Sequence, residues 1–146
     1  MKPWQIALIA LPFIALGLYY QVRPLSSKVL IRNTVITTEV AITESQKQKG
    51  LGGRTELEPD RGMLFVYDHK ETYNFWMRDM KFPLDFIWID GSVVADITQN
   101  VPPPGTDGTP VIIKPDVMVD KVLEVNAGFV KQHNITIGDT VIFRDR

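Results

Sequence analysis

Five charged side chains of this sequence stand within apolar stretches of the chain. They are Arg54, Arg78, Asp79, Asp85 and Glu124. Charged groups are rarely buried without a partner, because removing a charge from water is costly unless another group compensates for it. These residues therefore form either a network of paired charges that fixes loops onto a core, or the polar part of a site. Since buried charges persist only when paired, the network is the favoured interpretation.

The alternative interpretation is a ligand pocket. Asp79 and Asp85 lie in one aromatic-rich run, and a pair of carboxyl groups can act as acid and base in glycoside hydrolysis. That chemistry depends on the separation and burial of the two groups, so it stays open at this stage. Trp76, two residues before Arg78, could form an aromatic and cationic wall of such a pocket.

Other chemistries find little support in the sequence. The chain has no cysteine, which excludes disulfides, thiolate metal sites and cysteine nucleophiles. His69 and His133 are the only histidines, and none of the four serines stands in a nucleophile-elbow pattern. No calcium-loop spacing, phosphate loop or dinucleotide fingerprint occurs. We therefore predict neither a metal nor a cofactor, and we lean toward a protein that is not an enzyme.

Size and charge limit the kinds of partner. At 146 residues, the chain has room for one domain and a short appendage. The net charge is -1, and the lysines and arginines are scattered singly. Because nucleic-acid binding requires a basic surface, no nucleic-acid partner is predicted.

The amino-terminal segment is apolar from Ile6 to Tyr20. A helix over residues 4–22 would be about 28 Å long, close to the hydrocarbon thickness of a bilayer. We predict that residues 1–23 are a membrane anchor or uncleaved signal, 24–28 a linker, and 29–146 a globular domain on the outer side of the membrane, periplasmic or at the cell surface. A cleaved signal peptide is the alternative, with small residues at Ala15-Leu16-Gly17 and a secreted product. A buried core helix is a third, disfavoured by the lack of a polar face.

The rest of the chain reads as short strands with frequent turns. Thr43 and Gln46 form a capping-box pattern, which predicts a short helix that ends at Gly50. A second helical turn is predicted over residues 128–134, with Asn134 as a left-handed cap. A hairpin is expected at Asp90-Gly91, and residues 102–110 are too rich in proline and glycine for regular structure. Strands are predicted over residues 29–42 (one or two), 62–67, 73–77, 84–89, 92–101, 111–113, 121–125 and 135–143, the last interrupted by a turn at 138–139. This pattern is typical of a mainly β fold, a compact β-sandwich or small barrel with one or two short helices.

Five segments together carry a family resemblance. They are Gly50-Leu51-Gly52-Gly53-Arg54, Gly62-Met63-Leu64-Phe65-Val66, Phe75-Trp76-Met77-Arg78-Asp79-Met80 with Pro83-Leu84-Asp85, Val122-Leu123-Glu124-Val125-Asn126-Ala127-Gly128, and Ile137-Gly138-Asp139. In this order they resemble the bacterial and archaeal family called domain of unknown function 192, over about residues 39–143. The resemblance implies a compact, jelly-roll-like β-rich domain, often behind a signal peptide or membrane anchor, and implies no activity.

The chain departs from this family at two places. Arg78 and Asp79 stand where the family usually has lysine and asparagine, so a site that needs an amide donor there is in doubt. Gly52-Gly53 replaces the bulkier methionine that usually follows Gly-Leu, which predicts a looser turn.

The leading hypothesis is a membrane-tethered extracytoplasmic β-domain that binds a small ligand, an envelope polymer or a protein. Its site would include residues of the central stretch and the 102–110 loop. The candidate ligand-binding residues are Arg54, Trp76, Arg78, Asp79, Asp85 and Glu124. The rival hypotheses are a carbohydrate-active enzyme that uses Asp79, Asp85 or Glu124 as acid and base, and a structural accessory domain of an envelope complex.

Overall fold

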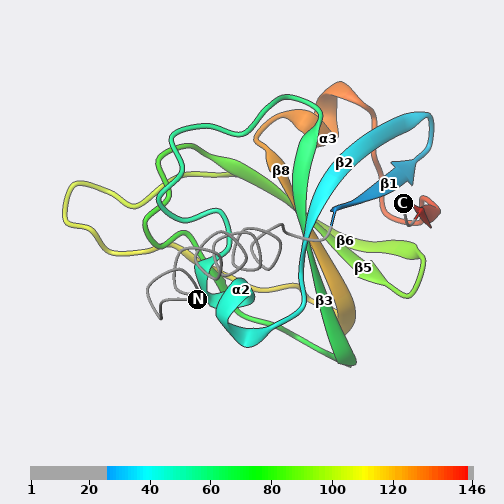
Figure 1. Ribbon diagram of the computed structural model, residues 1–146, viewed down its shortest axis with the longest axis horizontal. Helices are drawn as coiled ribbons and strands as arrows, with labels where there is room; N and C mark the ends of the chain where they lie inside the picture. Colours follow the sequence, from blue (N-terminus) through cyan, green and yellow to red (C-terminus); the bar gives the residue numbers. More distant parts are fainter. Residues whose placement is uncertain (1–25, 145–146) are drawn as a thin grey trace, which may run out of the picture.

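Seven strands form one sheet that is curled into a half-barrel (Figure 1). The computed structural model describes residues 26–144. In spatial order, the strands are β6 (Val93–Val101), β5 (Leu84–Asp90), β8 (Val119–Asn126), β3 (Arg61–Glu71), β2 (Thr34–Ala41), β1 (Ser26–Ile31) and β9 (Val141–Arg144). A separate ribbon pairs β4 (Phe75–Trp76) with β7 (Ile112–Ile113), and the two short helices are α2 (Glu44–Lys49) and α3 (Phe129–Gln132).

Side chains cover both faces of the sheet. In β5, Phe86 and Trp88 belong to one core cluster, while Ile87 and Ile89 belong to the other. The first cluster includes aromatic residues of β3 and β4, and the second includes the buried residues of α3. Because neighbouring residues of a strand point to opposite faces, β5 is buried throughout. The strand predicted over residues 84–89 is therefore present, and both of its sides are covered.

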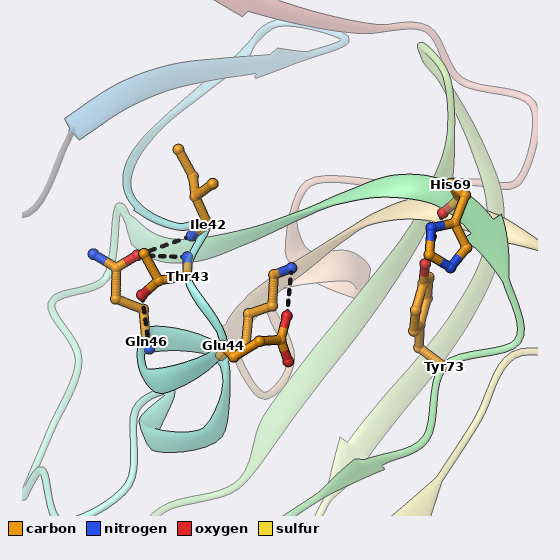
Figure 2. Close-up of polar contacts among 7 residues, drawn as sticks. Ile42, Thr43, Glu44, Gln46, His69 and Tyr73 are labelled. Carbon is orange, nitrogen blue, oxygen red and sulfur yellow. Dashed lines mark hydrogen bonds and ion pairs between the residues drawn. The ribbon is translucent and has the colours of Figure 1, made fainter.

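Helix α2 follows from its capping box. The side chain of Thr43 accepts a hydrogen bond from the Gln46 amide, and the Gln46 side chain accepts one from the Thr43 amide (Figure 2). These two bonds satisfy amides that a helix start otherwise leaves free. The helix ends at Gly50, where the positive φ of 48° turns the chain away from the helix axis. The predicted helix and its end are confirmed.

Most other elements lie where the sequence predicts them, with shifted ends. The β5–β6 hairpin turns at Gly91-Ser92, one residue later than predicted, because Asp90 already pairs with Val93. The strand predicted over residues 73–77 is only the two-residue β4, and the one predicted over 135–143 is regular only from Val141. Asn134 has a φ of 53°, as expected of a left-handed residue.

The predicted architecture, a jelly-roll-like β-sandwich or small barrel, is correct in part. The mainly β class and the two short helices are as expected, and the main sheet is curled into a half-barrel with a separate small ribbon. Within this sheet, β2 and β3 are parallel. Strand β1 begins at Ser26, so it includes most of the predicted linker of residues 24–28. The predicted amino-terminal helix lies outside the described residues, and within 26–144 no helix is long and apolar enough to cross a membrane.

Candidate functional site

A recess of about 270 Å³ opens beside α2, on the face of the sheet that carries the first core cluster. Helix α2 and the turn after it form one wall, and β4 with the residues after it forms another. Phe65 and Tyr67 of β3 contribute to the lining, as does Glu124 of β8. Three segments far apart in the sequence therefore meet around one buried carboxyl group.

The carboxyl group of Glu124 is the unusual feature of this recess. Glu124 is 5% exposed, and its Oε2 atom has no hydrogen-bond partner among the described residues. Burial raises the pKa of Glu124 from 4.5 to about 8, and the charge of Arg54 only partly opposes this effect. At neutral pH the carboxyl group is therefore mostly protonated. It has one O–H to donate and a carbonyl oxygen to accept with.

Aromatic rings make the walls of the recess rigid. Phe75 packs edge-on against Phe65, with ring centres 4.9 Å apart. Tyr67 stacks on Tyr73 at 3.6 Å, and the ammonium group of Lys47 lies 4.2 Å from the centre of the Tyr67 ring. Burial raises the pKa of Tyr67, so its hydroxyl stays neutral. Packed aromatic side chains thus bound this part of the recess.

The predicted aromatic and cationic wall is present at the mouth. Trp76 is 48% exposed, and the guanidinium carbon of Arg78 lies 5.5 Å from the centre of its ring. Both residues line the recess. An indole face that remains half exposed offers a stacking surface to a ligand.

A second recess, of about 630 Å³, continues from the first. The two share Gln48, Lys49, Gly52, Arg78 and Met80, so we treat them as one feature, the groove. Asp79 and Lys81 line only the second recess.

Two docked turns form the floor of the second recess. The Gly53 amide donates to the Asp79 carbonyl oxygen at 3.0 Å. A Cβ at Gly52 would lie 3.0 Å and 3.2 Å from the carbonyl oxygens of Lys49 and Arg78, so the glycine permits this close approach. Asp79 has a φ of 57°, a conformation that asparagine and aspartate adopt more readily than most residues. The turn is therefore tight rather than loose.

Asp85 does not lie in the groove. It is fully buried, and its carboxylate accepts hydrogen bonds from the Asn100 amide at 2.8 Å and the Val130 amide at 3.0 Å. In the sheet register, Asp85 pairs with Val125, whereas Phe86 pairs with Glu124. Paired residues project to the same face and successive residues to opposite faces, so the sheet separates the Asp85 and Glu124 carboxyl groups. Asp85 holds the start of α3 in place and has no access to the groove.

Arg54 belongs to an ion pair at a separate recess. Its guanidinium donates two hydrogen bonds to Glu39, at 2.6 Å and 2.7 Å, which hold the pKa of the Glu39 carboxyl below its usual range. This recess, of about 240 Å³, shares no lining residue with the groove. Arg54 acts on Glu124 through its charge alone. Arg54 therefore takes part in an ion pair, although its partner Glu39 is not one of the five predicted residues. The Oε2 atom of Glu124 takes part in no such network.

Of the predicted site residues, the groove brings together Trp76, Arg78, Asp79 and Glu124. The 102–110 loop lines neither recess of the groove. Among residues 26–144, no group of three or more histidines and acids is placed to hold a metal ion. Sequence reasoning missed Lys47, Lys49 and Tyr67. The capping box placed the first two on α2, but nothing local showed that this helix borders a recess.

The fold is a mainly β domain with a groove beside α2. Residues 27–143 match the family model described as Uncharacterized ACR, domain of unknown function 192, and the chain belongs to this family. The resemblance of the five sequence segments is thereby confirmed.

Two solved structures are similar to this chain. One is a candidate transcription regulator from Sinorhizobium meliloti 1021, with 30% identity and a TM-score of 0.77, covering 84% of this chain and 96% of that one. The other is a protein of unknown function from Novosphingobium aromaticivorans, with 32% identity and a TM-score of 0.69, covering 80% of this chain and 84% of that one. No curated protein matches the chain.

Proposed function

We propose that this protein binds a small polar ligand in the groove, with the protonated carboxyl group of Glu124 as the innermost contact. The observation that carries the proposal is a buried carboxyl oxygen without a partner in the wall of an accessible recess. Leaving a buried polar group unsatisfied costs about 1–3 kcal/mol. A fold tolerates such a cost where a ligand supplies the missing bond.

Binding is better supported than acid–base hydrolysis. Glycoside hydrolysis needs two carboxyl groups on either side of one bond. Asp85 lies across the sheet, and Asp79 lines only the second recess. Glu44 lines the first recess, but its side chain is 81% exposed and pairs with Lys47 at 3.3 Å. The groove therefore contains one carboxyl group whose pKa is strongly raised, and a single such group is better suited to binding a ligand than to acid–base hydrolysis.

The proposal places the domain at the outer side of a membrane, tethered by residues 4–22. This part rests on the apolar run of the sequence and its aromatic ends. Carbonate extraction of membranes from cells that express the full chain tests it. A retained span keeps the protein in the membrane pellet, whereas release into the soluble fraction would refute the anchor.

A substitution at Glu124 tests the role of the groove. Methionine has a similar length and no polar atom, so Glu124→Met removes the unsatisfied group and should stabilise the fold by about 1–3 kcal/mol. The variant should also lose binding of any small molecule that raises the melting temperature of the wild-type protein, in a panel of sugars, amino acids and dicarboxylates.

Trp76→Ala is the matched variant at the mouth, where the exposed ring contributes little to stability. A lower stability of Glu124→Met would mean that the carboxyl group has a structural role. Ligand-induced shifts that are unchanged in both variants would exclude the groove as the binding site.

A further inference from the structure

The charge of the residues that line the groove changes from one recess to the other. Its second recess is lined by the cations Lys49, Arg78 and Lys81, against the single carboxylate of Asp79. None of the three cations forms an ion pair with another described residue. The chain as a whole carries a net charge of -1, so this local excess of positive charge is specific to the groove. Free cations at the edge of a preformed recess favour an anionic group.

The first recess requires a different part of the ligand. The protonated carboxyl group of Glu124 can donate one hydrogen bond and accept another, and a hydroxyl group can do the same in return. The amides of Gln48 and Asn74, which also line this recess, have the same double capacity. Hydroxyl groups are therefore the natural partners at this end.

The aromatic wall at the mouth of the first recess adds an apolar surface. Trp76 lies at the mouth with nearly half of its surface exposed, and Arg78 beside it lines both recesses. The C–H face of a sugar ring can pack on the indole while its hydroxyl groups point away from it. A cationic ligand would instead meet Lys47, Lys49 and Arg78 on its way in.

We propose, on the basis of the proposed function, that the ligand is an acidic saccharide. Its sugar ring packs on Trp76 with hydroxyl groups toward Glu124, and its anionic group lies against Arg78, Lys49 and Lys81. The neutral part enters the first recess and the charged part stays in the second. The shared chemistry is an anion on a polyhydroxyl ring, which a uronic acid or a sugar phosphate can supply.

Titration of the full-length protein by two-dimensional NMR tests this assignment. The probes are D-glucuronate, D-glucuronamide, D-glucose and D-glucose 6-phosphate, which differ in the group at one carbon atom. The two anions should bind about tenfold or more tightly than the two neutral sugars, and should shift the amide signals of residues 48–53 and 76–81. A stronger effect of the phosphate or of the carboxylate identifies the source of the anion.

Two surface variants locate the anionic group. Arg78→Gln should remove most of the preference for the anions, and added salt should have a similar effect. Lys131→Gln is the matched control, because Lys131 is an exposed lysine of α3 on the opposite face of the sheet. Equal affinity for D-glucuronate and D-glucuronamide, an unchanged preference in Arg78→Gln, or no binding of any of the four probes would overturn the proposal.

Different results would refute the proposed function, which rests on Glu124, and the acidic-saccharide proposal. If glucuronate binds equally well to wild type and to Glu124→Met, the interior contact is wrong, although the anionic contact stands. If all four sugars fail but another ligand requires Glu124, the groove is a binding site and the acidic-saccharide proposal is refuted.

Discussion

The protonation of Glu124 should make the stability of this protein fall as the pH rises. In the unfolded chain the carboxyl group has a pKa near 4.5, whereas burial raises its pKa in the folded protein to about 8. The folded state therefore binds the proton more tightly than the unfolded state between these two values. Stability from this group is fully present below pH 4.5, declines as the pH rises, and is lost above about pH 8.

The magnitude follows from the two pKa values. Each pH unit between them is worth about 1.4 kcal/mol, so the whole interval corresponds to roughly 5 kcal/mol. The pKa of about 8 already includes the opposing charge of Arg54, so we expect a loss of about 5 kcal/mol. This is a large part of the total stability of a domain of this size, which is about 5–15 kcal/mol.

Urea unfolding of wild type and Glu124→Gln over the same pH series measures this effect. Glutamine keeps the shape of the side chain and removes its titration, so the difference between the two stability curves isolates Glu124. The other charged or titratable groups near Glu124 are unchanged in both proteins; they are Tyr67 of β3, Glu44, Lys47 and Lys49 of α2, and Arg54 and Arg78 of the loops. Wild type should lose stability relative to the variant as the pH rises from 5 toward 8.5. Parallel curves would refute the inference that the carboxyl group is protonated in the fold.

Three further substitutions test the rest of the structure. Asp85→Asn should destabilise the fold by about 2–4 kcal/mol in urea unfolding at pH 7, because two amides lose a charged acceptor; no loss would refute its anchoring role. Arg54→Met should cost about 1 kcal/mol, since its ion pair is partly solvated, and should move the pH midpoint of the Glu124 effect upward; an unmoved midpoint would show that the two charges do not interact. Gly62→Ala should cost about 1–3 kcal/mol, because its Cβ would lie 2.6 Å from the Glu124 carbonyl oxygen, whereas Gly105→Ala in the proline-rich loop should be nearly neutral; equal melting temperatures would contradict this packing.

Local sequence patterns predicted most of the elements. The capping box of Thr43 and Gln46 is a contact within one turn, so the sequence contains all the information that it needs. The double burial of β5 was equally visible in its run of apolar residues. The parallel pairing of β2 with β3 was not, because it joins segments separated by α2 and a long connection. Strand order depends on such distant contacts, so the local patterns predicted the mainly β class but not the single curled sheet.

The site was also predictable only where it depends on residues that are close together in the sequence. Trp76 and Arg78 are two residues apart, and their contact follows from that spacing. The roles of the carboxyl groups depend instead on the register between β5 and β8, which no local pattern reveals. Arg54 was grouped with Glu124 because both stand in apolar surroundings, yet its hydrogen bonds go to Glu39.

The register of one strand pair assigns opposite roles to two buried acids. Asp85 and Glu124 occupy neighbouring strands of the same sheet, and each is almost without exposure. Asp85 points to the face where the start of α3 supplies an amide, and its charge is satisfied there. Glu124 points to the other face, where it lines the recess beside α2, and its Oε2 atom accepts no hydrogen bond from a described residue. A shift of one residue in this register would bring both acids onto the same face of the sheet, so the observed register is what separates their roles. The register of β5 against β8 and the position of α2 thus place Glu124, and not Asp85, in the lining of the groove, and the capping box that fixes the start of α2 contributes to this arrangement.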